Sequence, residues 1–288
     1  MNGIETIIEG VLLGGVYALF ALGLSLMFGI MRLVNLAHGD LIVLAAYLML
    51  ALTNALGLPL ILAASLIIIV MFAVGFLLQR LVLERVLGDD ILPPLLVSFG
   101  LSIIIQNGLL LAYGADSHRL QGGAFESASI ALGPDLNIGL APLTALFSAI
   151  AAVALLELIF YRTSLGRAFR ATADNPIVAQ LMGIDERTVY AVAVGLSLSI
   201  SVIAAVTFGI RANFDPSIGP ARLLYAFESV IIGGLGSLWG TLAGGIVLGL
   251  AQAIGARINP EWQILAGHLA FLAVLVMRPR GLFPSRRQ

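Results

Sequence analysis

The chain of 288 residues contains no cysteine and no lysine. Without cysteine it forms no disulfide, no thiolate metal site and no cysteine nucleophile. The phosphate-binding loop of nucleotide-driven proteins needs a lysine inside its glycine-rich turn, so this chain cannot build that loop. Schiff-base chemistry is excluded on the same ground, since all 15 basic residues are arginines. Any process that consumes ATP must therefore rely on another protein.

Charged residues are scarce as well. They make up 11% of the chain, hydrophobic residues make up 60%, and the mean hydropathy is +1.05. Soluble domains do not reach such values, so the composition predicts an all-α, polytopic membrane protein. The N-terminus is acidic and no small-residue cleavage site follows the first apolar run. Residues 11–30 are therefore expected to be a retained span rather than a signal peptide.

Apolar segments of suitable length recur along the whole chain. A helix needs about 20 mostly apolar residues to cross the roughly 30 Å hydrocarbon core of a bilayer. The predicted spans are 8–30, 36–52, 60–79, 94–113, 140–161, 189–210 and 264–277. A further apolar region, 224–256, is too long for one upright helix and is broken by Gly233, Gly234, Gly236, Gly240, Gly244 and Gly245. We expect one membrane-embedded domain, 1–288, with eight to ten spans or part-spans.

The arginines indicate the orientation, because cytoplasmic loops collect basic residues. If 224–256 crosses twice, or dips and returns, 11 arginines share one side with the C-terminus and 4 lie opposite. A single crossing would give a split of 8 and 7. We therefore expect the N-terminus outside and the C-terminus in the cytoplasm. This places 162–188 in the cytoplasm and makes 114–139 an external loop with at most a short surface helix.

The segment 164–185 is charged and helix-compatible within an otherwise apolar chain. Asp174, Asn175 and Pro176 form a helix-entry pattern, and Gly183 supplies a stop. Between them one helix face is apolar, formed by Ile177, Val178, Leu181 and Met182. Such a helix either lies on lipid headgroups or docks into a partner. The polar face lacks the basic residues expected for lipid binding, which favours docking over a surface helix or a plain connector.

Polar residues also occur at the start of the second predicted span, where Asn35, His38 and Asp40 lie close together. Ionisable side chains deep in a membrane usually face a cavity or another helix. Alternatively, Asn35 caps the helix at the membrane interface and Asp40 lies in its positive first turn. Position in the sequence alone favours the interfacial cap.

Further polar residues lie inside the spans. Ser98, Ser102 and Gln106 recur at intervals of four and so share one face of the fourth span, and Glu228 lies in the region 224–256. These residues form either interhelical hydrogen bonds or the lining of an aqueous path, and both interpretations fit the sequence.

The sequence also contains a glycine repeat, and it lacks catalytic motifs. Gly236, Gly240 and Gly244 create a groove for close helix packing. The three histidines show no metal-ligand spacing, and no G-x-S-x-G or H-E-x-x-H motif occurs. We therefore expect no catalytic site and no metal site in this chain.

Four stretches together carry a recognisable pattern. They read GGVYALFALGLSLMFGIMRLVNLAHGDLIVLAAY, LLVSFGLSIIIQNG, ADNPIVAQLMGID and FDPSIGPARLLYAFESVIIGGLGSLWGTLAGGIVLGL. The pattern resembles the membrane permease of branched-chain amino acid ABC importers, and it is more similar to the shorter of the two permeases in that system. The resemblance runs nearly end to end, with NLAHGD and GGLGSLWGTLAGG as its most specific parts.

The resemblance implies a transport subunit in the cytoplasmic membrane of a bacterium or archaeon. Its implied partners are a second related permease, two cytoplasmic ATPase subunits and a periplasmic binding protein, with no nucleic acid. ATP would be used by the ATPase subunits, and this chain would bind no cofactor. The substrate path for an aliphatic zwitterion would be lined by small and polar residues. The candidates are Ser98, Ser102, Gln106 and Glu228, with Asn35 and His38 nearer the cytoplasmic exit.

By the same likeness, 164–185 corresponds to the region that couples the permease to an ATPase. The candidate coupling residues are Arg167, Arg170, Asp174, Asn175, Gly183 and Asp185. The general importer pattern E-A-A-x-x-x-G followed by I-x-L-P is not preserved, since the chain reads Ala-Thr-Ala-Asp at 171–174 and no proline follows Gly183.

Other functions remain open from the sequence. Permeases for urea and short amides carry similar motifs. An ion-coupled secondary transporter would need deep acidic residues, of which the spans offer few. A passive channel or an intramembrane enzyme is a further alternative.

Overall fold

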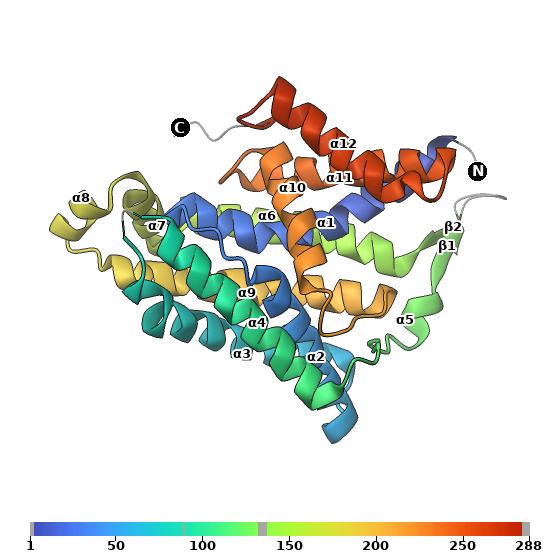
Figure 1. Cartoon of the computed structure of the whole chain (residues 1–288), viewed down its shortest axis with the longest axis horizontal. Coiled ribbons are helices and arrows are strands. Elements are labelled where there is room, and N and C mark those ends of the chain that lie inside the picture. The colour runs from blue at the N-terminus through green and yellow to red at the C-terminus, as the bar shows by residue number, and fades with distance from the viewer. Residues whose placement is uncertain (1–2, 89, 132–136, 284–288) are drawn as a thin grey trace.

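The computed structural model describes residues 3–88, 90–131 and 137–283 (Figure 1). Within these residues, seven helices are long and apolar enough to cross a membrane. They are α1 (Gly3–Met31), α2 (His38–Leu56), α3 (Leu60–Leu81), α4 (Leu92–Tyr113), α6 (Leu140–Arg162), α9 (Glu186–Arg211) and α11 (Leu238–Ile258). A 3-10 turn, η1 (Leu83–Arg85), extends the third of them. Two shorter helices join the bundle, α10 (Gly219–Gly233) and α12 (Trp262–Met277). The chain is thus an all-α, multi-pass membrane protein.

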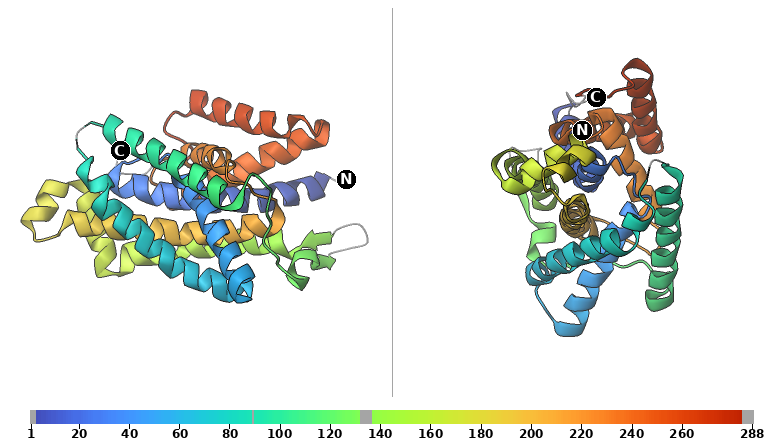
Figure 2. Two further views of the ribbon diagram at one scale, coloured as in Figure 1. Left: turned by 60° about the horizontal axis from the view of Figure 1, so that its bottom comes forward. Right: turned by 90° about the vertical axis from the view of Figure 1, so that its left-hand side faces the viewer.

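Helix α1 is the centre of the bundle. In the most apolar 18 residues of α1, 83% of the stretch is buried within the protein, whereas the corresponding share for α4 is 17%. α1 packs against α6, α9, α10 and α11 (Figures 1 and 2). Its residues are apolar nearly all round, as expected for a helix surrounded by protein. The exposed apolar faces of α3 and α4 are instead suited to lipid or to another membrane subunit.

Glycines let the central helices approach closely. A Cβ at Gly14 of α1 would lie 2.7 Å from the carbonyl oxygen of Gly245 in α11, and one at Gly249 would overlap Gly10. Gly240 and Gly244 likewise face α10, against Gly233 and the carbonyl of Ser229. Larger side chains at these positions would push the backbones apart.

The long apolar region divides into a part-span, α10, and a full span, α11. The turn between them occupies 234–237 and includes Gly236, whose φ of +77° favours glycine. Gly236 contacts Gly29 near the end of α1, and the amide of Leu282 donates to the carbonyl of Ile232 at 2.8 Å. The ends of α1 and α10 and the segment after α12 therefore meet at one end of the bundle.

The segment 162–188 forms two short helices, α7 (Ser164–Asp174) and α8 (Pro176–Leu181). They lie at the left in Figure 1, at the bundle end that holds the end of α1, whereas α1 begins at the opposite end. The side of the membrane that each end faces stays a prediction.

The segment 114–139 contains more structure than expected. It holds the short helix α5 (Ala124–Ser127) and two antiparallel strands, β1 (Ser129–Ala131) and β2 (Asn137–Gly139), which pair Ile130 with Ile138. The short helix was expected from the sequence but the strands were not, because three-residue strands give too short an alternation to recognise. Residues 132–136 lie outside the described part.

Candidate functional site

The start of α2 lies deep in the bundle. After α1 the chain reverses at Arg32, which has a φ of +53°, and residues 32–37 run back alongside α1. His38 then places its Nε2 atom 3.0 Å from the carbonyl oxygen of Phe20. Phe20 lies 11 residues before the end of α1, or about 16 Å along its axis. His38 is fully buried there, a position that differs from the interfacial cap favoured by the sequence.

Asn35 and Asp40 flank this helix start. The Oδ1 atom of Asn35 accepts a hydrogen bond from the amide of Ala37 at 3.0 Å, which forms a turn just before α2 rather than a cap on it. Asp40 lies in the first turn of α2, as the sequence indicates, but it is 1% exposed. Its Oδ2 atom accepts a hydrogen bond of 2.5 Å from the hydroxyl of Ser102.

The polar face of α4 packs against this region. The hydroxyl of Ser98 accepts a hydrogen bond from the amide of Leu36 at 3.1 Å, and the side-chain amide of Gln106 donates to Ser102 at 3.0 Å. Ser98 and Ser102 are buried, whereas Gln106 is half-buried and reaches a shallow pocket. This face of α4 thus bonds the loop before α2 through Ser98 and α2 itself through Ser102, and it reaches a surface at Gln106.

A second helix start meets the first one. Gly219 at the beginning of α10 lies against the carboxylate of Asp40, and Gly39 lies against the carbonyl of Gly219. Three polar atoms at this α2–α10 junction are buried and have no partner among the described residues: Asn35 Nδ2, His38 Nδ1 and Asp40 Oδ1. Helices that start inside a membrane bundle are a common element of transporter sites, because their free backbone amides are available at that depth.

Glu228 has a partner that sequence analysis missed. Its Oε1 atom lies 2.5 Å from Nδ1 of His268 in α12. Glu228 is 2% exposed, whereas a third of the His268 side chain is exposed and covers it. The pair joins α10 to α12 across 40 positions, so no local spacing shows it. The only signal was a titratable residue inside each of two spans, since such residues seek one another.

The α7–α8 segment is built by side-chain caps. Thr163 accepts from the amide of Gly166 at 3.0 Å, and Asn175 accepts from the amide of Val178 at 3.1 Å. Asp185 caps α9, where a 2.5 Å hydrogen bond from the hydroxyl of Thr188 holds the pKa of its carboxyl below the ordinary value. Gly183 has a φ of +83°, so it reverses the chain after α8.

The apolar face of α8 points away from the bundle. Ile177, Val178, Leu181 and Met182 are 70%, 52%, 81% and 78% exposed. By contrast, Phe169 of α7 is buried against Phe160 of α6, which anchors the segment. The guanidinium of Arg170 lies over the ring of Tyr161, 5.2 Å from its centroid, whereas Arg167 is exposed. Helix α8 therefore protrudes with exposed apolar side chains, while α7 is packed against α6.

These features together define a class. A bundle with helices that start inside the membrane, a polar junction at its centre and a capped apolar helix protruding from one end is a membrane transport component. The sequence comparisons specify it further. Residues 6–276 match the family described as the permease component of branched-chain amino acid transport systems, so the chain belongs to that family.

Two relatives match this chain over nearly their whole length, and a third is longer. The high-affinity branched-chain amino acid transport system permease protein BraD of Pseudomonas aeruginosa is 27% identical over 97% of this chain and 95% of its own. LivH of Escherichia coli, with the same description, is 28% identical over 97% and 94%. LivM of Escherichia coli is 24% identical over 94% of this chain and 68% of its own. The expected resemblance to the shorter permease is confirmed.

A solved structure shares the fold. PsaBC from Streptococcus pneumoniae in complex with Fab is 13% identical, has a TM-score of 0.51, and matches over 96% of this chain and 93% of that one. This likeness concerns the fold alone. The chain is accordingly a multi-pass permease component of the branched-chain amino acid ABC transport family rather than an enzyme.

Proposed function

We propose that this chain forms the translocation path for branched-chain amino acids in an ATP-driven importer of a bacterial or archaeal cytoplasmic membrane. The observation that supports the proposal is the family match over residues 6–276. The chain itself binds no cofactor in this scheme. Two cytoplasmic ATPase subunits hydrolyse ATP, and a periplasmic binding protein delivers the substrate.

A second, related permease completes the pathway. The chain resembles both LivH and LivM of Escherichia coli, two permease proteins with the same system name, which supports pairing between related chains. The exposed apolar faces of α3 and α4 offer ample surface for such a membrane partner.

The α7–α8 segment is the ATPase contact, on the cytoplasmic side. Four large apolar side chains exposed to water are costly, and a partner's groove would cover them. The rigid caps at Thr163, Asn175 and Asp185 would transmit a push on α8 to α6 and α9, which are membrane spans. The segment 114–139 lies outside in this orientation.

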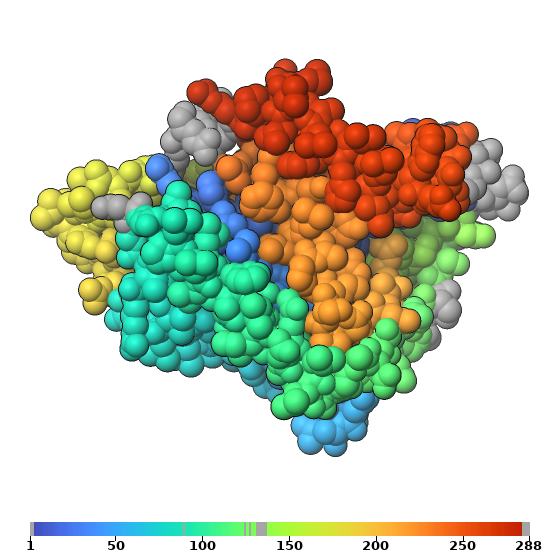
Figure 3. All heavy atoms as spheres, in the orientation of Figure 1, coloured from blue at the N-terminus to red at the C-terminus, as the bar shows by residue number. Residues whose placement is uncertain are grey.

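The path runs along the face of the molecule on which α4, α10 and α12 are all seen in Figure 3, where α10 packs against α12. Gln106 reaches that surface, and Glu228 lies just beneath it under His268. Ser98, Ser102, Asn35 and His38 form the layer behind, where they hold the helices that line the path.

Uptake of radiolabelled leucine tests the proposal. Cells that lack their own branched-chain amino acid importer should accumulate leucine when they express this chain together with its partner subunits. Unlabelled isoleucine and valine should compete, whereas urea and acetamide should not. Uptake that needs no ATPase subunit, or competition by amides alone, would contradict the proposal.

A further inference from the structure

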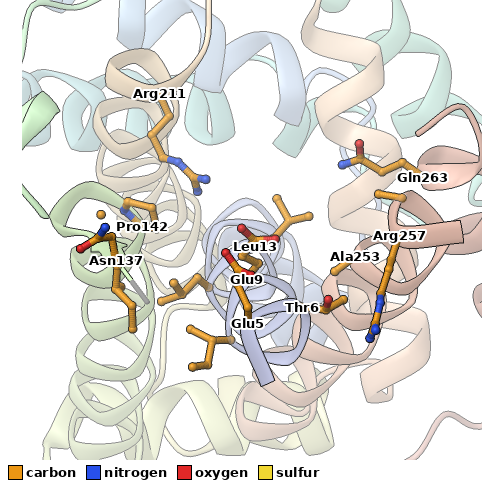
Figure 4. A pocket seen from close by; sticks show the side chains of 15 residues that line it. Glu5, Thr6, Glu9, Leu13, Asn137, Pro142, Arg211, Ala253, Arg257 and Gln263 are labelled. Atoms are coloured by element: carbon orange, nitrogen blue, oxygen red, sulfur yellow. The ribbon is translucent and has the colours of Figure 1, made fainter. Parts of the chain in front are cut away.

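A cavity of about 430 Å³ surrounds the start of α1, at the bundle end opposite α8 (Figure 4). It lies between α1, β2, the start of α6, the ends of α9 and α11, and the start of α12. Its size falls within the range of roughly 300–1,000 Å³ typical of small-molecule sites. Part of its wall is apolar and is formed by Ile8, Leu12, Leu13, Ile138, Pro142 and Ala253.

The remaining wall carries charges of both signs. Glu5 and Glu9 come from α1, Arg211 from the end of α9 and Arg257 from α11. Although they line one cavity, none of these four side chains forms an ion pair or a side-chain hydrogen bond within the described part of the chain. In Figure 4, Arg211 points from α9 toward α1, where the carboxylate of Glu9 lies. The charges are thus gathered without being neutralised by one another.

A buried polar residue also lies in the wall of this cavity. Thr6 is 3% exposed and lines the cavity, yet its hydroxyl has no hydrogen-bond partner among the described residues. Buried hydroxyls are nearly always satisfied, so an unpaired one beside a cavity indicates a missing partner. The amide of Gln263 points toward α1 from the other wall and adds a second donor and acceptor.

From this arrangement we infer that the cavity binds a zwitterion, a molecule with an ammonium group, an anionic group and an apolar body. The carboxylates of Glu5 and Glu9 suit the ammonium group, and the guanidinium groups suit a carboxylate or phosphate, which arginine binds in a bidentate manner. A single-sign ligand would leave two of the four charges uncompensated. The apolar wall accommodates an aliphatic chain.

Two kinds of ligand combine an ammonium group, an anionic group and an apolar body. One is an aliphatic amino acid at the outer mouth of the permease, a reading that rests on the function proposed above. The other is the headgroup of an aminophospholipid, since the cavity lies where the spans end. The shared requirement is the pair of opposite charges, and the choice of probe separates the two sources.

Isothermal titration of the purified full-length chain in detergent tests the inference. The probes are L-leucine and dihexanoyl phosphatidylethanolamine. Whichever probe binds the wild-type chain should bind the double variant Glu9→Gln/Arg211→Gln at least tenfold more weakly. Glu261→Gln is the control, because Glu261 is exposed at the start of α12 and does not line the cavity. Thr6→Val, which keeps the shape and removes the hydroxyl, should weaken binding with less effect on the fold.

Binding of leucine alone assigns the cavity to the substrate, and binding of the lipid alone assigns it to the bilayer. The inference is overturned if neither probe binds the wild-type chain, or if the double variant and Thr6→Val both bind as the control does. Leucine uptake by cells is measured in parallel, so failure of the cavity inference remains distinguishable from failure of the transport function. Reduced uptake with unchanged probe binding would also overturn the inference, since the charges would then serve a docking protein.

Discussion

The α2–α10 junction and helix α8 are opposite in character. At the junction, polar side chains such as His38 and Asp40 are buried in an apolar bundle. At α8, apolar side chains such as Leu181 and Met182 are exposed. The junction is held by contacts within this chain, to Phe20, Ser102 and Gly219. The apolar face of α8 has no comparable cover in the described structure, and we proposed above that a partner protein covers it.

The largest expected effect is at the junction. Gly39→Ala should destabilise the protein by about 1–3 kcal/mol or more, because a Cβ there overlaps the carbonyl of Gly219 and overpacking is costly. Gly108→Ala is the control, since Gly108 lies in α4 and no other element of the described chain comes within 4 Å of the added carbon. Thermal unfolding in detergent measures both. Equal stability of the two variants would show that the two helix starts do not meet closely.

A substitution in helix α8 should affect partner binding rather than stability. Leu181→Asp should leave thermal stability unchanged and weaken ATPase association by about 2 kcal/mol, or roughly 30-fold, as removal of an interface hot spot does. Gln180→Asp, on the exposed polar side of the same helix, adds the same charge and should have little effect. Co-purification with the ATPase subunits measures the difference. An intact complex with Leu181→Asp would contradict docking at this face.

Smaller effects are expected on the polar face of α4, where Gln106 is proposed to line the path and Ser102 to hold the helices together. Gln106→Leu should lower leucine uptake about fivefold, equivalent to about 1 kcal/mol, because Gln106 reaches the surface. Ser102→Ala should instead cost about 0.6 kcal/mol of stability, the usual worth of an interhelical hydrogen bond in a membrane. Uptake assays and unfolding curves distinguish the outcomes. If Gln106→Leu transports normally, the path lies elsewhere.

The smallest effect concerns Asp185, which is exposed. Its folded-state pKa is lowered by the Thr188 hydroxyl, so its contribution is present above the unfolded value of about 4 and is lost as the pH falls through the folded value. Asp185→Ala should therefore destabilise α9 slightly at pH 7, with the difference from wild type shrinking toward pH 3. Asp185→Asn, also a good cap, should remain close to wild type at pH 7. A difference independent of pH would contradict this account.

The spans were predictable because hydropathy reports burial in lipid directly. The position of His38 was not predictable, since it depends on the positive φ of Arg32 and arginine has no preference for that conformation. The Gly10–Gly14 and Gly245–Gly249 pairs were missed although each shows the small-x-x-x-small spacing in the sequence. The Glu228–His268 pair could not be placed, because it depends on how α10 and α12 pack.

Helix α8 was the easiest element to predict. Its cap residue, apolar face and terminal glycine are all local signals, and they act within ten residues. The junction, in contrast, joins residues more than 60 positions apart, such as Asp40 and Ser102. Local features of this chain were therefore accessible from its sequence, and its long-range polar contacts were not.

Helix α8, as proposed above, is a cytoplasmic surface that a partner protein covers. Because the chain has no cysteine, Leu181→Cys introduces a unique thiol. Labelling with a membrane-impermeant maleimide should succeed in inside-out vesicles stripped of ATPase subunits and fail in right-side-out vesicles. Adding the ATPase subunits back should protect the thiol. Labelling from the outside, or labelling unaffected by the ATPase subunits, would contradict the claim.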